Sequence, residues 1–178
     1  MLVDLRGSFH NVLDLLSEQS DWKLFRPDPP VQILGSLGNT PVGFRQLKRS
    51  LPIETQMCET SVGALRIPTL DEMICIKAFL CCQRNQTRDY LDFAALSSLV
   101  LESSVMDSLM KIPLRYAEFG ADVGLLVAQR LTQCEPADRS SISLEGYKGL
   151  KADWQNWDRV RQICVRFGHL LGEALIVR

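Results

Sequence analysis

The sequence has no long hydrophobic run and almost no net charge. No segment approaches the ~18 consecutive apolar residues that a membrane-spanning helix requires. Twenty Lys and Arg residues against 21 Asp and Glu residues leave a formal net charge of −1. The chain as a whole therefore has no electrostatic attraction for nucleic acid. A nucleic-acid site would have to be a local basic patch, and no membrane partner is predicted.

Metal-binding and disulfide patterns are also lacking. The six cysteines include no Cys-x-x-Cys pair, and Cys81 and Cys82 are adjacent within a predicted helix. This arrangement suits neither a zinc site nor a disulfide framework, so free thiols are predicted. Met1 is followed at once by Asp4 and Arg6, without an apolar leader segment. A cytoplasmic location is therefore expected.

Histidine is scarce, which removes a common catalytic base. The only two, His10 and His169, are far apart in sequence and have no metal-ligand partner at a recognised spacing. Ser8, Ser36 and the cysteines likewise have no base near them in the sequence. Nothing in the sequence predicts a hydrolase.

The first part of the chain alternates short apolar stretches with turn residues. Phe9, Val12, Leu13 and Leu16 lie at helical spacing and predict an amphipathic helix over residues 9–19. Short apolar runs bounded by proline, glycine or serine then predict β-strands over residues 22–25, 31–34, 42–47, 53–57 and 61–67. One small antiparallel or mixed sheet is expected from these strands.

Beyond Pro68 the apolar spacing becomes helical. Helices are predicted from Thr69 or Asp71 to about Arg84, from Arg88 or Asp89 onwards, over residues 106–110, over residues 123–131 and from about Asp153. The sequence thus predicts an α+β protein, with a sheet domain over residues 1–68 and a helical domain over residues 69–178. With 178 residues, of which 46% are hydrophobic, the chain can bury one core or two small ones.

Charged side chains interrupt the first two of these helices. Lys77 and Arg84 share one predicted face with apolar residues, and Asp89 and Asp92 lie three residues apart on the next helix. The apolar residues of that face are Met73, Ile76 and Leu80. The two carboxylates are expected to meet the two cations between packed helices. Such a cluster is either a structural ion-pair network or part of a binding site.

The same residues resemble a known family. Lys77, Arg84 seven residues later, and then Arg88-Asp89-x-x-Asp92-x-x-x-Leu96 are similar to a motif of AbiEii-type nucleotidyltransferases. These are the toxin components of bacterial toxin–antitoxin and phage-defence systems. The stretches Leu144 to Leu150 and Trp154-x-x-Trp157 resemble the tail of the same proteins, so the resemblance covers residues 22 to about 171. It implies a small nucleotidyltransferase sheet domain joined to a helical domain.

The resemblance also implies a cofactor and an RNA or nucleotide ligand. Nucleotidyl transfer requires Mg²⁺ held by carboxylates, a nucleoside triphosphate, and a Gly-Ser turn followed by Asp-x-Asp. Asp4 matches the second acid of that motif, but Leu2 stands at the first, so the chain is expected to be truncated at its N-terminus. Glu54 lies in an apolar strand context, as the third acid would, although a solvent-facing strand glutamate explains it as well. Asp4 and Glu54 are therefore the candidate catalytic and metal-binding residues.

Neither Gly-Ser pair of the chain is followed by acids at the expected spacing. Gly7-Ser8 and Gly35-Ser36 are each better interpreted as an ordinary turn. A short basic run of Arg45, Lys48 and Arg49 could contact phosphate, although a solvated strand end explains it as well.

Two functions follow from these patterns. In the first, Lys77, Arg84 and Arg88 bind the phosphates of a nucleotide or RNA, while Asp89 and Asp92 fix the positions of these cations. In the second, the chain is a non-catalytic interaction protein that pairs with an antitoxin, an intact toxin or a second copy of itself. A sheet that lacks part of itself exposes an unpaired edge, which predicts a homodimer.

Overall fold

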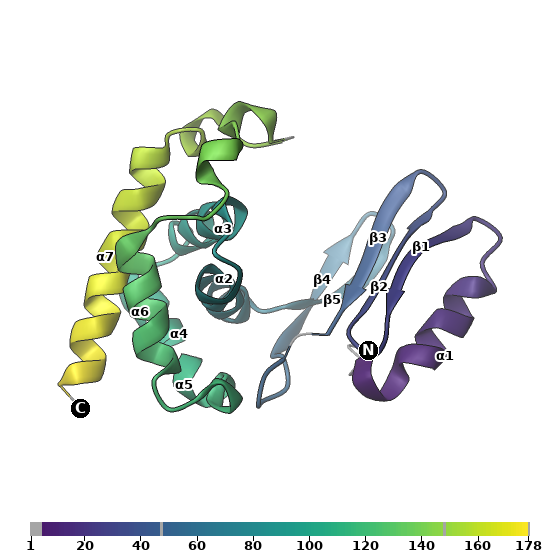
Figure 1. The fold of residues 1–178 in the computed structure, drawn as a ribbon, viewed down its shortest axis with the longest axis horizontal. Coiled ribbons are helices and arrows are strands. Elements are labelled where there is room, and N and C mark those ends of the chain that lie inside the picture. Colours follow the sequence, from purple (N-terminus) through teal and green to yellow (C-terminus); the bar gives the residue numbers. More distant parts are fainter. Residues whose placement is uncertain (1–4, 47, 148, 178) are drawn as a thin grey trace. The chain divides into compact units, whose positions relative to one another are not determined.

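The computed structural model describes residues 5–46, 48–147 and 149–177. The chain divides into two compact units, Met1–Lys48 and Arg49–Arg178, which are described separately (Figure 1). Asp4 lies outside the described residues. The α+β class predicted from the sequence is confirmed.

The first unit is a three-stranded sheet with one helix. Helix α1 (Leu5–Ser17) precedes strands β1 (Trp22–Asp28), β2 (Gln32–Leu37) and β3 (Thr40–Arg45). The strands are antiparallel in the order β1-β2-β3. A small core of Leu5, Phe9 and Ile33 joins the helix to β2, because the apolar face of α1 packs on the sheet.

The two Gly-Ser pairs are not turns, contrary to the sequence interpretation. Gly7-Ser8 lies within α1, and Gly35-Ser36 lies within β2. Gly35 is needed for packing, since a Cβ there would come 2.5 Å from ring atoms of Trp22. The turn between β2 and β3 instead contains Gly38, whose φ of +56° favours glycine.

The second unit begins with a hairpin and continues as a helical bundle. Its elements are β4 (Thr55–Thr60), β5 (Gly63–Pro68), α2 (Leu70–Arg84), α3 (Thr87–Ser97), α4 (Glu102–Leu109), α5 (Ile112–Arg115), α6 (Val123–Gln133) and α7 (Trp157–Ile176). Short 3₁₀ turns connect the later helices. The hairpin strands pair with each other, so the described strands form two antiparallel sheets rather than the single predicted sheet.

Helix α2 is the centre of this bundle. It packs against α3, α4 and α6, while α7 packs on α6 and α3 at the outer side (Figure 1). Thr69 Oγ1 caps its N-terminus by accepting the Glu72 N–H at 3.2 Å, as the predicted start at Thr69 requires.

None of the helices described is long and apolar enough to cross a membrane.

The buried face of α2 differs from the predicted one. Leu80 of the predicted face is buried, but Met73 and Ile76 are only partly buried. The fully buried apolar residues include Ile74, Cys75 and Ala78 instead. Three helices surround α2, so burial is not restricted to the single stripe that helical periodicity assumes.

The division of the chain also differs from the predicted boundary at residues 68 and 69. The structure divides between Lys48 and Arg49, which places the β4–β5 hairpin with the helices. Hydrogen bonds explain this grouping: Glu54 O accepts the Thr69 N–H at 3.0 Å, and the Glu54 N–H donates to Glu72 Oε2 at 3.0 Å. The start of the hairpin is therefore attached to the start of α2.

Candidate functional site

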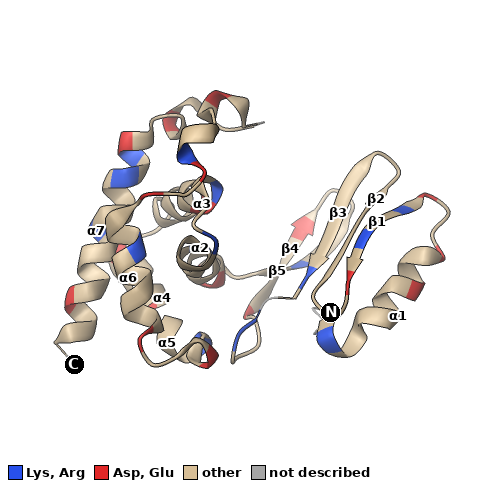
Figure 2. Ribbon diagram, viewed as in Figure 1, with Lys and Arg blue, Asp and Glu red and all other residues tan. Residues whose placement is uncertain are grey.

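The helix pair α2–α3 brings together most of the residues of the family-like motif. Lys77 Nζ lies 2.6 Å from Asp92 Oδ2 and 3.5 Å from Asp89 Oδ1. Both basic and acidic residues are visible on these two helices (Figure 2). The predicted meeting of Lys77 with both carboxylates is confirmed, and the side chain of Lys77 remains 25% exposed. We call Lys77, Arg88, Asp89 and Asp92 the helix-pair cluster.

The two arginines of the motif extend to the surface. Arg88 lies 3.8 Å from Asp92, and its side chain is 73% exposed. Arg84 is exposed and makes no ion pair with any residue that the structure describes, so its predicted meeting with the carboxylates is wrong. Arg84 lies seven positions after Lys77 on the helix, about 10 Å along the axis. Carboxylates that contact Lys77 therefore do not reach Arg84.

Asp89 is the buried member of the helix-pair cluster. Its side chain is 3% exposed, and its Oδ2 atom has no hydrogen-bond partner within the described ranges. Asp89 lies in the first turn of α3, where the partial positive charge of the helix N-terminus stabilises a carboxylate. The Lys77 ammonium supplies the second stabilising charge.

Residues from a later segment border this cluster, and sequence spacing did not identify them. Burial raises the pKa of Tyr147, and the carboxylates of Asp138, Asp92 and Asp89 raise it further against the opposing effect of Arg88. Asp138 itself accepts hydrogen bonds from Thr87 at the start of α3. Because these contacts join residues about 50 positions apart, no local periodicity reveals them.

A second ionic cluster lies where the hairpin meets the helices. We call it the Arg115 cluster; it consists of Arg49, Glu54, Asp71, Glu72, Lys111 and Arg115. The buried Arg115 guanidinium contacts Asp71 at 2.7 Å and both glutamates at 2.9 Å. Arg49 Nη1 lies 2.7 Å from Glu72 Oε2 and its side chain is only 5% exposed, so this buried cation is not available as the phosphate contact considered from the sequence.

The same guanidinium contacts a thiol. Arg115 Nη1 donates to Cys75 Sγ at 2.9 Å, and the Cys75 thiol donates to Ser108 O at 2.7 Å. Burial raises the pKa of Cys75 to about 12, although Arg115 opposes that rise. The thiol is therefore protonated and unreactive at neutral pH, which is a structural role rather than a nucleophilic one.

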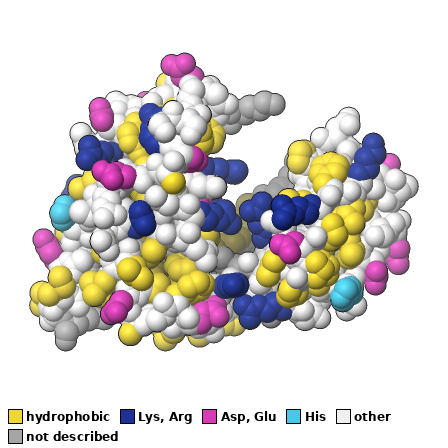
Figure 3. Space-filling view, in the orientation of Figure 1, with side chains coloured by type: hydrophobic (Ala, Val, Ile, Leu, Met, Phe, Trp, Pro, Cys, Tyr) yellow, Lys and Arg dark blue, Asp and Glu magenta, His cyan; other side chains and the backbone are white. Residues whose placement is uncertain are grey.

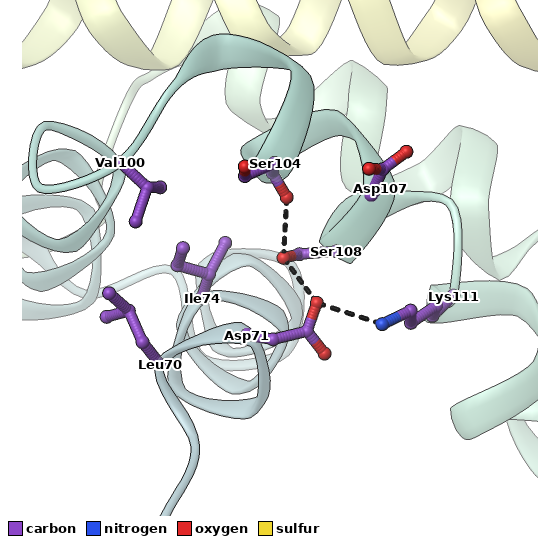
Figure 4. A pocket seen from close by; sticks show the side chains of 8 residues that line it. All are labelled: Leu70, Asp71, Ile74, Val100, Ser104, Asp107, Ser108 and Lys111. Carbon is purple, nitrogen blue, oxygen red and sulfur yellow. Dashed lines mark hydrogen bonds and ion pairs between the residues drawn. The ribbon is translucent and has the colours of Figure 1, made fainter.

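A shallow hollow of about 260 Å³ borders the Arg115 cluster (Figure 4). Its lining includes Leu70, Ile74, Ser108 and Lys111, around the carboxylate of Asp71. Asp71 Oδ1 accepts from Ser108 Oγ at 2.6 Å and from Lys111 Nζ at 3.1 Å. Burial by itself would raise the pKa of Asp71, but these hydrogen bonds and Arg115 outweigh it and lower that pKa. This carboxylate is already satisfied by the protein.

Glu54, a predicted metal-binding and catalytic residue, lies in the Arg115 cluster and not in the helix-pair cluster. Its carboxylate is 58% exposed and lies 2.9 Å from Arg115 Nη2. Across residues 5–46, 48–147 and 149–177, no three His, Cys, Asp or Glu side chains are placed to hold a metal ion. The charged partner of Glu54 in the structure is a cation, Arg115.

No family model and no solved structure matches this sequence. The chain is similar to the mycolic acid-containing lipids exporter MmpL11 of Mycolicibacterium smegmatis, with 28% identity over 125 residues. That match covers 67% of this chain but only 12% of the exporter. The chain thus spans about an eighth of that relative's length, and the match assigns it no family.

Proposed function

We propose that this chain is a nucleotidyltransferase-like protein of the bacterial toxin–antitoxin or phage-defence type that acts in the cytoplasm. In this proposal it binds the phosphates of a nucleotide or an RNA through Lys77, Arg84 and Arg88. The observation that carries the proposal is the placement of Lys77 between Asp89 and Asp92, with Arg88 beside it at the surface. The resemblance of these residues to the AbiEii-type motif supplies the ligand class.

The geometry of the cations supports phosphate binding. The Lys77 ammonium has three N–H donors. Asp89 and Asp92 accept from two of them, which leaves the third donor for a phosphate oxygen. Exposed guanidinium groups bind phosphate with paired hydrogen bonds, and Arg84 and Arg88 are both exposed. Further Lys and Arg side chains lie on the visible face of this unit (Figure 3).

Nucleotide transfer, as opposed to binding, stays a prediction that involves Asp4, Glu54 and Mg²⁺. Incorporation of labelled nucleotide into RNA would establish it, provided that Glu54→Ala or Asp4→Ala abolished the incorporation. Absence of incorporation leaves the proposed binding function intact, because the helix-pair cluster does not include Glu54.

Binding is tested by titrating ATP into purified protein and into single variants. Arg84→Ala and Arg88→Ala are each expected to weaken ATP binding about tenfold, because a charge-assisted hydrogen bond to phosphate contributes roughly 1.5–3 kcal/mol. Arg161→Ala is the matched control, since Arg161 is an exposed arginine of α7 outside the motif. Equal affinities of all three variants and the wild type would contradict the proposal.

One observation favours the alternative, an interaction protein. Met57, Val62 and Leu65 are exposed on the β4–β5 hairpin, whose strands are paired only with each other among the strands described. Exposed strand edges with apolar side chains pair readily with another chain, including a second copy. A protein that does not bind ATP or RNA but forms a dimer at tens of micromolar would favour this alternative.

A further inference from the structure

The start of α3 is capped by a residue far away in the sequence. Gln86, at the N-cap position, makes no side-chain cap hydrogen bond. Asp138 Oδ1 instead accepts the Thr87 backbone N–H at 2.7 Å and the Thr87 hydroxyl at 2.8 Å. Thr87 is fully buried, so the loss of this acceptor would leave two buried donors without a partner.

The same distant segment also holds the turn between α2 and α3. The Ala137 N–H donates to Asn85 O at 2.8 Å, and Asn85 Nδ2 donates to Glu135 O at 3.0 Å. Asn85 ends α2 in the left-handed conformation, and its Oδ1 accepts the Tyr90 hydroxyl at 2.7 Å. Residues 135–138 therefore fix the turn on both sides.

This capping determines where the charged residues of α3 lie. Arg88 and Asp89 directly follow Thr87 in the first helical turn, and Asp92 follows one turn later. A shift or fraying of that turn would move Asp89 and Asp92 away from Lys77 Nζ. The negative charge of Asp138 at the helix N-terminus further stabilises the first turn.

We propose that Asp138 is a positioning residue for the phosphate-binding site on α2–α3. It holds the first turn of α3 so that Asp89 and Asp92 fix Lys77 and Arg88 lies beside them. Asp138 does not touch the ligand. The inference rests on the proposed function for its ligand, although the position of α3 can be measured without a ligand.

The test compares two variants that each lose a helix N-cap. Asp138→Ala removes the cap of α3, whereas Asn156→Ala removes the cap of α7, where Asn156 Oδ1 accepts the Arg159 N–H at 3.2 Å. Melting temperature, ATP affinity and amide hydrogen exchange are measured for both. Asp138→Ala is expected to weaken ATP binding by about fivefold to tenfold. Asn156→Ala should lower the melting temperature similarly and leave ATP affinity unchanged.

Asp138→Asn provides the conservative rescue, because asparagine is as good a cap as aspartate. We expect this variant to retain ATP affinity and slow exchange of the Asp89 amide, which donates to Gln86 O at 3.0 Å. Equal ATP affinity of Asp138→Ala and Asn156→Ala would overturn the inference. If the wild type binds neither ATP nor RNA, the proposed function fails. Amide exchange then decides the position of α3 by itself: faster exchange of the Asp89 amide only in Asp138→Ala supports the inference, and equal exchange in both variants overturns it.

Discussion

Replacing Arg115 with methionine is expected to lower the free energy of unfolding by about 3–5 kcal/mol. The variant keeps a flexible apolar stem but removes the guanidinium that contacts Glu54, Asp71, Glu72 and Cys75. Glu72 is fully buried, so it would lose one of its two cationic partners while remaining shielded from water. Urea denaturation measures the change.

An exposed ion pair supplies the control for this variant. Arg166 lies 2.5 Å from Glu102, and both side chains are largely exposed. Arg166→Met is expected to change the free energy of unfolding by no more than about 1 kcal/mol. If Arg115→Met were as mild as Arg166→Met, the Arg115 cluster would not be the attachment between the hairpin and the helices that its contacts indicate.

Two glycines four residues apart in α7 are expected to respond to alanine with opposite signs. A Cβ at Gly168 would come 2.5 Å from the Thr132 backbone nitrogen and 2.8 Å from Ala128 O, both in α6. Backbone atoms cannot rotate away, so the helices must separate, and Gly168→Ala should destabilise the protein by about 1–3 kcal/mol. A Cβ at Gly172 meets only the Ala128 Cβ, at 3.9 Å.

Gly172→Ala should therefore stabilise the protein by up to about 1 kcal/mol, through the higher helix propensity of alanine. Unfolding midpoints in urea, compared at constant m-value, give both changes. Destabilisation by both variants, or by neither, would contradict the close α6–α7 contact at Gly168.

Local sequence patterns predicted the elements better than the contacts between them. The start of α2 at Thr69 and the meeting of Lys77 with Asp89 and Asp92 follow from capping and helical spacing, which involve near neighbours in the sequence. Arg115 lies in a four-residue helix, over 40 positions from Asp71 and Glu72, and no periodicity connects them.

The predictions that differ from the structure have the same origin. Glycine marks turns locally, which favours a turn at Gly35, whereas the structure needs Gly35 because the absence of a side chain leaves room for the Trp22 ring across the sheet. Helical spacing predicts Arg84 on the face of α2 that meets α3, but the distance along the helix separates it from the carboxylates. Asp138 was not identified, since capping by a residue 51 positions away leaves no local signal.

The salt dependence of RNA binding tests the central claim, phosphate binding by the helix pair, most directly. A short single-stranded RNA is titrated against the wild type and the Arg84→Ala/Arg88→Ala variant over a range of salt concentrations. Each lost phosphate contact should reduce the slope of log affinity against log salt by about 0.7. We expect a reduction of roughly 1.4 for two contacts. An unchanged slope, with unchanged affinity, would contradict it.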